Sequence, residues 1–156
     1  MKKRGLRLLA ALIACLLLAA CTARLTPYTA ASVEYVWTDH VHGGSYRLYA
    51  VRGEDGAHVT VTRCAQSDGT VYTHETDAPA SLFTEIDALL TESRFKQMAE
   101  KPEKDPYVVP DETWSIRVTP QEGAADTVTS LHDLDAADHK ACSALIELLE
   151  TAAQEP

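Results

Sequence analysis

Long hydrophobic runs are scarce in this chain of 156 residues. The longest unbroken apolar stretch, Leu8–Ala20, has 13 residues, whereas a membrane-spanning helix needs about 20. Arg7 precedes this stretch, and Arg24 and Pro27 follow soon after it. We therefore expect that it does not serve as a spanning anchor in the mature protein.

Basic residues are few after residue 20. All 23 acidic residues lie in that part of the chain, but only 10 of the 14 lysines and arginines do, which leaves a formal charge of −13. Phosphate recognition depends on clustered lysine and arginine, so this composition excludes nucleic acid and disfavours anionic lipid head groups as partners. Such acidity serves solubility, or it attracts a cationic protein, a cationic peptide or a metal ion.

Cysteine is rare as well. Cys15 and Cys21 lie in the first 21 residues, and only Cys64 and Cys142 remain beyond them. In an exported protein this pair could form a disulfide, which would close a long loop and contribute roughly 4 kcal/mol to stability. The alternative is two separate buried thiols, because unpaired cysteine is among the most buried residue types. Both interpretations stay open.

Catalytic signatures are also missing. The sequence has no Gly-x-Ser-x-Gly nucleophile elbow, no glycine-rich phosphate loop, no Cys-x-x-Cys and no His-Glu-x-x-His, which are motifs of hydrolases, nucleotide-binding proteins and zinc sites. These absences argue against an enzyme. A hydrolase that uses paired carboxylates stays open, because 23 acidic residues allow many pairs.

The first 20 residues have the layout of a secretory signal peptide. Four basic residues, Lys2, Lys3, Arg4 and Arg7, precede the apolar stretch, which ends in small residues. A positively charged start, a short apolar segment and a small-residue end are typical of such a peptide. We therefore predict that residues 1–20 are cleaved on export.

The end of this peptide resembles the lipobox of bacterial lipoprotein precursors. That motif reads aliphatic, small, small, cysteine, and Leu18-Ala19-Ala20-Cys21 matches it at all four positions. The resemblance implies a diacylglycerol thioether on Cys21, cleavage between Ala20 and Cys21, and acylation of the new amino terminus. Two or three acyl chains hold a protein firmly on a bilayer. The resemblance thus implies a lipid-anchored protein that faces outside the cytoplasm, at the cell surface or in the periplasm.

The remaining chain divides into a tether and a domain. Residues 21–32 are small or polar with one proline, and we expect them to form a lipidated tether. Residues 33–156 are enough for one hydrophobic core but too few for two ordinary domains. We therefore predict a single domain.

Alternating and β-branched segments predict strands. Ser32–Thr38 alternates and suits a half-buried strand. Tyr46–Arg52 and Ala57–Cys64 are joined by Gly53-Glu54-Asp55-Gly56 and form the clearest hairpin. Thr70–Thr76 is expected to be the third strand of the same meander.

Two segments have helical periodicity. Apolar residues recur at spacings of three and four from Leu82 onward, which predicts an amphipathic helix to about Met98. A second helix is expected to begin at Asp135 as its N-cap, after a strand pair at Thr113–Thr119 and Asp126–Leu131. We therefore predict an α+β fold with a largely antiparallel sheet of about five strands and two helices packed on one face. The expected order is strand-strand-strand-helix-strand-strand-helix.

The second half of the chain is also similar, more loosely, to small uncharacterised bacterial α+β domains. These have an acidic turn, a Trp-Ser strand, a hairpin partner and a closing helix. The matching residues are Asp111, Glu112, Trp114, Ser115, Ile116 and Val118. Glu112 stands where that pattern has a glycine, and the similarity implies no activity.

Histidines mark two candidate metal sites. His40 and His42 lie on one side of an extended segment, while His132 and His139 flank an acidic helix start, with Cys142 one turn further on. Imidazole, carboxylate and thiolate are ligands that zinc and copper accept. Acidic residues at a helix start are equally expected for capping alone. We therefore keep metal binding as an alternative and otherwise expect no cofactor.

A binding role is the leading hypothesis. Tyr49, Tyr72 and neighbouring threonines would lie on the sheet face that the helices leave open, and such a face could bind a peptide, a glycan or a partner protein. We therefore predict a non-catalytic interaction module, held on a membrane through lipid on Cys21, with a cationic protein or peptide as a possible partner. The alternatives are a metal-binding lipoprotein that takes zinc or copper and, third, an extracellular hydrolase.

Overall fold

The computed structural model describes residues 25–64, 69–104 and 110–154. The signal peptide, the lipobox and Cys21 lie outside these residues, so their assignments stay predictions. The described residues form six strands and three helices. Their bounds are β1 (Ala30–Asp39), β2 (Ser45–Arg52), β3 (Ala57–Cys64), β4 (Val71–Ala78), α2 (Ser81–Glu92), α3 (Phe95–Ala99), β5 (Glu112–Pro120), β6 (Asp126–Thr129) and α4 (Ala136–Ala152).

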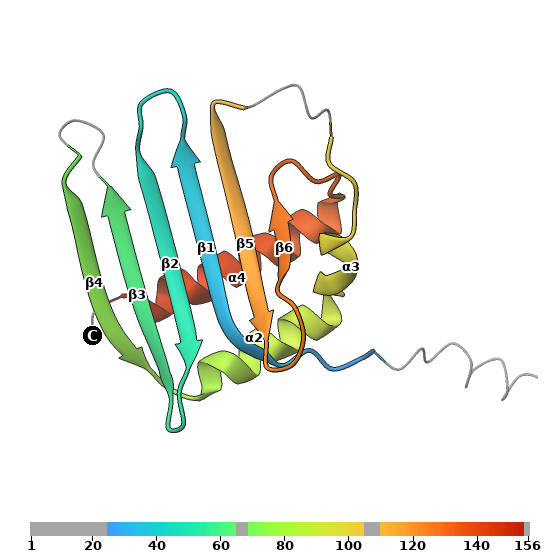
Figure 1. Cartoon of the computed structure of the whole chain (residues 1–156). Coiled ribbons are helices and arrows are strands. Elements are labelled where there is room, and N and C mark those ends of the chain that lie inside the picture. Colours follow the sequence, from blue (N-terminus) through green and yellow to red (C-terminus); the bar gives the residue numbers. More distant parts are fainter. Residues whose placement is uncertain (1–24, 65–68, 105–109, 155–156) are drawn as a thin grey trace, which may run out of the picture.

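The strands form one antiparallel sheet in the order β4-β3-β2-β1-β5-β6 (Figure 1). β1 lies in the interior of the sheet, where it pairs with β2 on one side and β5 on the other. The chain therefore passes from its N-terminal segment directly into an interior strand.

This architecture confirms the predicted α+β class and the antiparallel sheet, but the predicted counts and order were wrong. The half-buried strand predicted at 32–38 is confirmed as part of β1, but the sheet has six strands and not about five. The observed order is four strands, two helices, two strands and a helix. Alternation in a sequence reports that a segment is extended, but it does not report which strands it pairs with.

The helix expected to run to about Met98 is divided into α2 and α3. The division lies at Arg94, whose φ of 55° is in the left-handed region. The Ser93 backbone N–H bonds to the Leu89 carbonyl at 2.9 Å and closes the last turn of α2. The chain then turns so that Phe95 and Met98 are buried and α3 contacts β6. The apolar spacing continues across Arg94, so periodicity alone did not report the turn.

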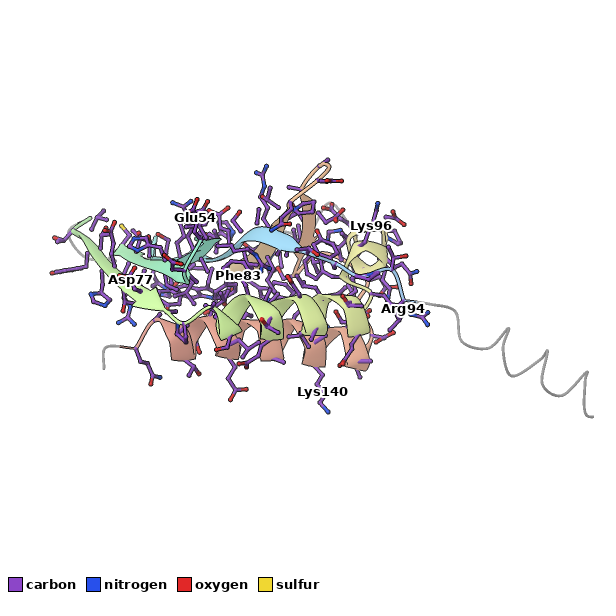
Figure 2. The ribbon with its side chains drawn as sticks, turned by 90° about the horizontal axis from the view of Figure 1, so that it is seen from below. Glu54, Asp77, Phe83, Arg94, Lys96 and Lys140 are labelled. Carbon is purple, nitrogen blue, oxygen red and sulfur yellow. The ribbon has the colours of Figure 1, made fainter. Side chains whose placement is uncertain are left out.

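Alternate positions along the strands supply the sheet side of the core. Val33 on β1 lies opposite Ala50 and Val118 in the two ladders, and all three are fully buried. α2 and α4 contact each other, and both lie on the same side of the strands in Figure 2. Their buried residues join the same cluster: Leu82, Phe83, Ile86 and Leu90 from α2, and Cys142, Leu145 and Leu149 from α4.

Contacts with the body of the domain begin at Tyr28, ahead of residue 33. The Tyr28 backbone N–H donates to Thr91 Oγ1 at 2.9 Å, and its hydroxyl donates to Asp126 Oδ2 at 2.8 Å. Its ring meets Phe95 edge-on, with 6.4 Å between the ring centroids. Residues 28–32, which the sequence places in the tether, are therefore held by the domain.

A second set of contacts fixes the start of β1. Asp87 on α2 accepts hydrogen bonds from the Ala30 backbone N–H at 2.9 Å and from Arg52 Nη2 at 2.7 Å. Arg52 Nε in turn donates to the Ala30 carbonyl at 2.8 Å, and its guanidinium lies over the Phe83 ring at 4.6 Å from the centroid. This set of contacts, the Asp87 clamp, joins the start of β1 and the end of β2 to α2.

We predict that Asp87→Ala lowers the free energy of unfolding by about 2 kcal/mol. The substitution removes the acceptor of the Ala30 N–H and leaves the half-buried Arg52 guanidinium without its carboxylate; residual exposure keeps the loss below that of a fully buried pair. Urea unfolding of the full chain measures it. Glu85→Ala, an exposed acid on the same helix, is the matched control and should change stability by less than about 0.5 kcal/mol. Equal effects of the two substitutions would contradict the clamp.

Candidate interaction surfaces

The first histidine pair lies in the turn between β1 and β2. Asp39 accepts hydrogen bonds from the backbone N–H groups of Val41 and His42, both at 2.9 Å, and lies 2.9 Å from His42 Nδ1. His40 Nε2 instead lies 2.8 Å from Thr113 Oγ1. The two imidazoles therefore have different partners, and the observed role of Asp39 is to order the turn. The hydrogen bond from the His42 backbone is the main reason why the pKa of Asp39 is lowered.

The second histidine pair lies near the start of α4. His132 is buried, and its Nδ1 accepts the Thr129 backbone N–H at 2.9 Å. His139 lies on the first turns of α4 and is exposed. Asp135 is the N-cap, as predicted, and forms a capping box with Asp138. The acids at this helix start therefore cap it, and Asp138 also bonds to Lys101.

Neither pair forms a metal centre in the described residues. No three His, Cys, Asp or Glu side chains in 25–64, 69–104 and 110–154 are grouped so that they could hold a metal ion. His40, His42 and His132 each bond to a different residue, Thr113, Asp39 and Thr129.

The two thiols of the domain lie on opposite sides of the sheet. By alternation along β3, Cys64 shares a face with His58, Thr60 and Thr62, while Cys142 on α4 is buried in the core. No disulfide joins these two residues in the described part of the chain. Burial, with a smaller effect of the nearby Asp138 carboxylate, raises the pKa of Cys142 to about 11. A thiol of this kind is protonated at neutral pH and packs as an apolar group.

The sheet face opposite the core is broad and polar. Its alternate positions carry eight threonines: Thr38, Thr60, Thr62, Thr73, Thr113, Thr119, Thr127 and Thr129. Arg47 pairs with Glu34 at 2.5 Å and lies over the Tyr49 ring at 5.4 Å. His58 bonds to Asp77 at 3.0 Å, which raises the pKa of His58. Charges on this face therefore largely neutralise one another.

Only one of the two tyrosines expected on this face lies there. Tyr49 does, but Tyr72 lies opposite Arg63 in the β3–β4 ladder and so points to the core side of the sheet. Tyr72 is nevertheless 62% exposed, because it lies on the edge strand β4. Once the register of the strands is known, alternation along β2 and β4 assigns Tyr49 and Tyr72 to opposite faces of the sheet.

A Ser-x-x-Lys spacing at Ser93 and Lys96 bears on the hydrolase alternative, because one class of serine hydrolases uses that spacing on a helix. Here Ser93 is the C-cap of α2, and Lys96 lies on α3 beyond the left-handed Arg94. Ser93 Oγ donates to the Leu90 carbonyl at 3.4 Å. The two side chains are thus not arranged along one helical turn, and the spacing does not form a nucleophile with its base.

An apolar hollow lies between α2 and α4. This groove of about 580 Å³ is lined by Ala78, Pro79, Ser81, Leu82, Glu85, Leu89, Ala144, Glu147, Leu148, Thr151 and Ala152. Leu89 and Leu148 are half-buried, whereas Glu85 and Glu147 are exposed. Neither glutamate forms an ion pair with a described residue. The groove therefore combines an apolar floor with charge of one sign.

Sequence periodicity did not point to this groove. Leu89 and Leu148 lie on the apolar faces of their helices, so the pattern assigns them to the core. In the structure both leucines are half-buried and line the groove between the two helices. The signal that could have found them is the width of the apolar stripe, which exceeds what the sheet covers.

No protein-family model matches this chain, and no curated protein matches it significantly. Within the described residues, no helix is both long and apolar enough to cross a membrane. The surfaces are therefore interpreted from their own geometry.

We predict that Asp39 contributes stability that is lost in acid. Its folded-state pKa is lower than the usual 3.8, so on acidification the unfolded chain takes up a proton first, and stability falls as the pH drops through the folded-state pKa. The difference in unfolding free energy between the natural chain and Asp39→Asn should be largest above about pH 5 and shrink towards about pH 3. Urea unfolding across this range measures it, with exposed Glu54→Gln as control. A difference independent of pH would contradict this role.

Proposed function

We propose that this protein is a membrane-anchored, extracytoplasmic lipoprotein that acts as a non-catalytic interaction module. Its contact surface in this proposal is the groove between α2 and α4, and its partner is a cationic amphipathic segment of another protein or a peptide. In this arrangement the helices cover one face of the sheet and offer their outer groove to the partner. The lipobox resemblance at residues 18–21 supports the anchor.

The observation that carries the proposal is the charge pattern of the groove. Its floor holds the apolar side chains of Leu82, Leu89 and Leu148, and its only charged side chains are the carboxylates of Glu85 and Glu147. An amphipathic helix that enters a groove places its apolar side chains on the floor and its flanks against the rims. A partner with lysine or arginine on those flanks would meet complementary charge, and this favours both association rate and orientation.

The open sheet face supports this role less well. Its Arg47 is paired with Glu34, and His58 is paired with Asp77, so it presents little net charge to a partner. Two of its threonines already have partners within the protein, Thr113 with His40 and Thr129 with His132. The groove, by contrast, keeps half-exposed leucines in contact with solvent, and covering such side chains is favourable at about 25 cal/mol per Å².

We predict that a model helix with leucines on one face and lysines on its flanks binds the mature protein in the groove. The probe is a synthetic peptide of this design, and the control peptide carries glutamates in place of the lysines. Calorimetry on the mature protein in detergent should detect the first and not the second. Leu148→Lys places a positive charge on the groove floor, which repels the lysines of the peptide. It should weaken binding at least about tenfold, or about 1.4 kcal/mol.

Val41→Lys is the matched control variant. Val41 is 60% exposed in the turn between β1 and β2 and does not line the groove, so this variant introduces the same charge elsewhere on the surface. It should bind the lysine peptide as the natural chain does. Equal binding of the two peptides, or binding unchanged by Leu148→Lys, would contradict the proposed contact surface.

A further inference from the structure

The end of the molecule where the described chain begins has a fixed geometry. Residues 25–29 run between two hollows, one beside α2 and α3 and the other beside the turn that joins β5 to β6, and Lys96 lines both. Tyr28 is held there by Thr91, Asp126 and Phe95. The chain therefore leaves the domain at one defined place.

The chain available between this place and the lipid is short. Cys21 and Tyr28 are seven residues apart in the sequence, which spans at most about 25 Å when fully extended. A 17-residue helix such as α4 is about as long as this. The inference rests on the proposed lipidation of Cys21: with that anchor, the exit end must stay within about one domain length of the bilayer.

Basic side chains flank the exit in a chain that is otherwise strongly acidic. Arg94 and Lys96 are exposed and lie at the end of the domain where the described chain begins (Figure 2). Neither forms an ion pair with a described residue. Leu25, 41% exposed, adds an apolar side chain at the same place.

Carboxylates are present at this end too, and the three that line its two hollows outnumber the two bases. Glu100 lines the first hollow, and Glu122 and Asp126 line the second. Asp126 is engaged by the Tyr28 hydroxyl. Arg94 and Lys96 therefore offset most of this charge and leave a formal charge of −1 (2 − 3), whereas the charged residues that line the helix groove, Glu85 and Glu147, are both acidic. An anionic leaflet repels the rest of the domain and attracts Arg94 and Lys96, and this attraction acts within about one Debye length of the surface.

We propose that the exit end, defined by Leu25, Arg94 and Lys96, faces the phospholipid head groups, with the phosphates as the ligands of the two basic side chains. In this orientation the exit end is the part of the domain nearest to the bilayer. α2 and α4 extend away from the bilayer, because both helices lie lengthwise between the exit end and the opposite end of the domain in Figure 2. The groove between them is lined by α2 and by the last turns of α4, and α2 reaches the exit end only where it ends, next to Arg94.

The test measures which end of the lipidated mature protein lies near the bilayer. A fluorescent amino acid is introduced at Gln97, exposed at the exit end, or at Glu54, exposed in the β2–β3 turn. Each protein is reconstituted in vesicles of phosphatidylcholine and phosphatidylglycerol that contain an acceptor lipid. Energy transfer should be strong from position 97 and weak from position 54. Equal transfer from the two positions would overturn the orientation.

Charge variants separate head-group contact from the tether alone. Lys96→Glu, alone and with Arg94→Glu, should abolish the difference between the two positions, and high salt should do the same to the natural chain because it screens the charges. Lys140→Glu, the same charge change on the exposed side of α4, should leave the difference intact. A difference that survives Lys96→Glu combined with Arg94→Glu would overturn the role of these two residues.

Failure of the anchor gives a separate result. Vesicle flotation reports whether the protein is membrane-bound at all, before energy transfer is measured. If the natural chain does not float, the lipid anchor is wrong, and the proposed function fails with this inference. If it floats but shows no preferred end, only this inference fails.

Discussion

The Asp87 clamp is the constraint on which the arrangement of this protein depends. One carboxylate on α2 holds the backbone of Ala30 and the guanidinium of Arg52, and Arg52 closes the set by donating to the Ala30 carbonyl. These bonds fix the start of an interior strand against the helix layer. Because β1 pairs on both sides, an error at its start would disturb the ladders with β2 and β5 together. The N-terminal segment is thereby tied to the centre of the fold.

The surfaces of the domain differ in the charges that they present to solvent. The open sheet face pairs its charges within itself, as Arg47 does with Glu34. The groove between α2 and α4 presents Glu85 and Glu147 beside apolar side chains. The exit end is the place where exposed bases occur next to the start of the described chain. A domain held by a short lipid tether at that end would keep its acidic groove available to a partner.

Local features were predictable from the sequence, but their assembly was not. Val59 and Val61 alternate clearly enough to assign their strand and face, and Asp135 with Asp138 identifies a helix start from two residues. The interior position of β1 depends on pairing with residues more than 80 positions away, as Val33 pairs with Val118, which alternation does not report. Likewise, Glu85 and Glu147 share a groove only because two helices that are distant in the sequence pack together. Spacing also did not report that His40 bonds to Thr113 and His42 to Asp39.

The measurement that tests the account most directly is mass spectrometry of the N-terminal peptide of the mature protein, isolated from the membranes of the cells that make it. The account predicts a chain that begins at Cys21 and carries a diacylglycerol group on its sulfur, with or without an acyl group on its amino terminus. Such a peptide would place the lipid seven residues from Tyr28. A mature chain with an unmodified Cys21, or one that begins at another residue, would contradict the anchor.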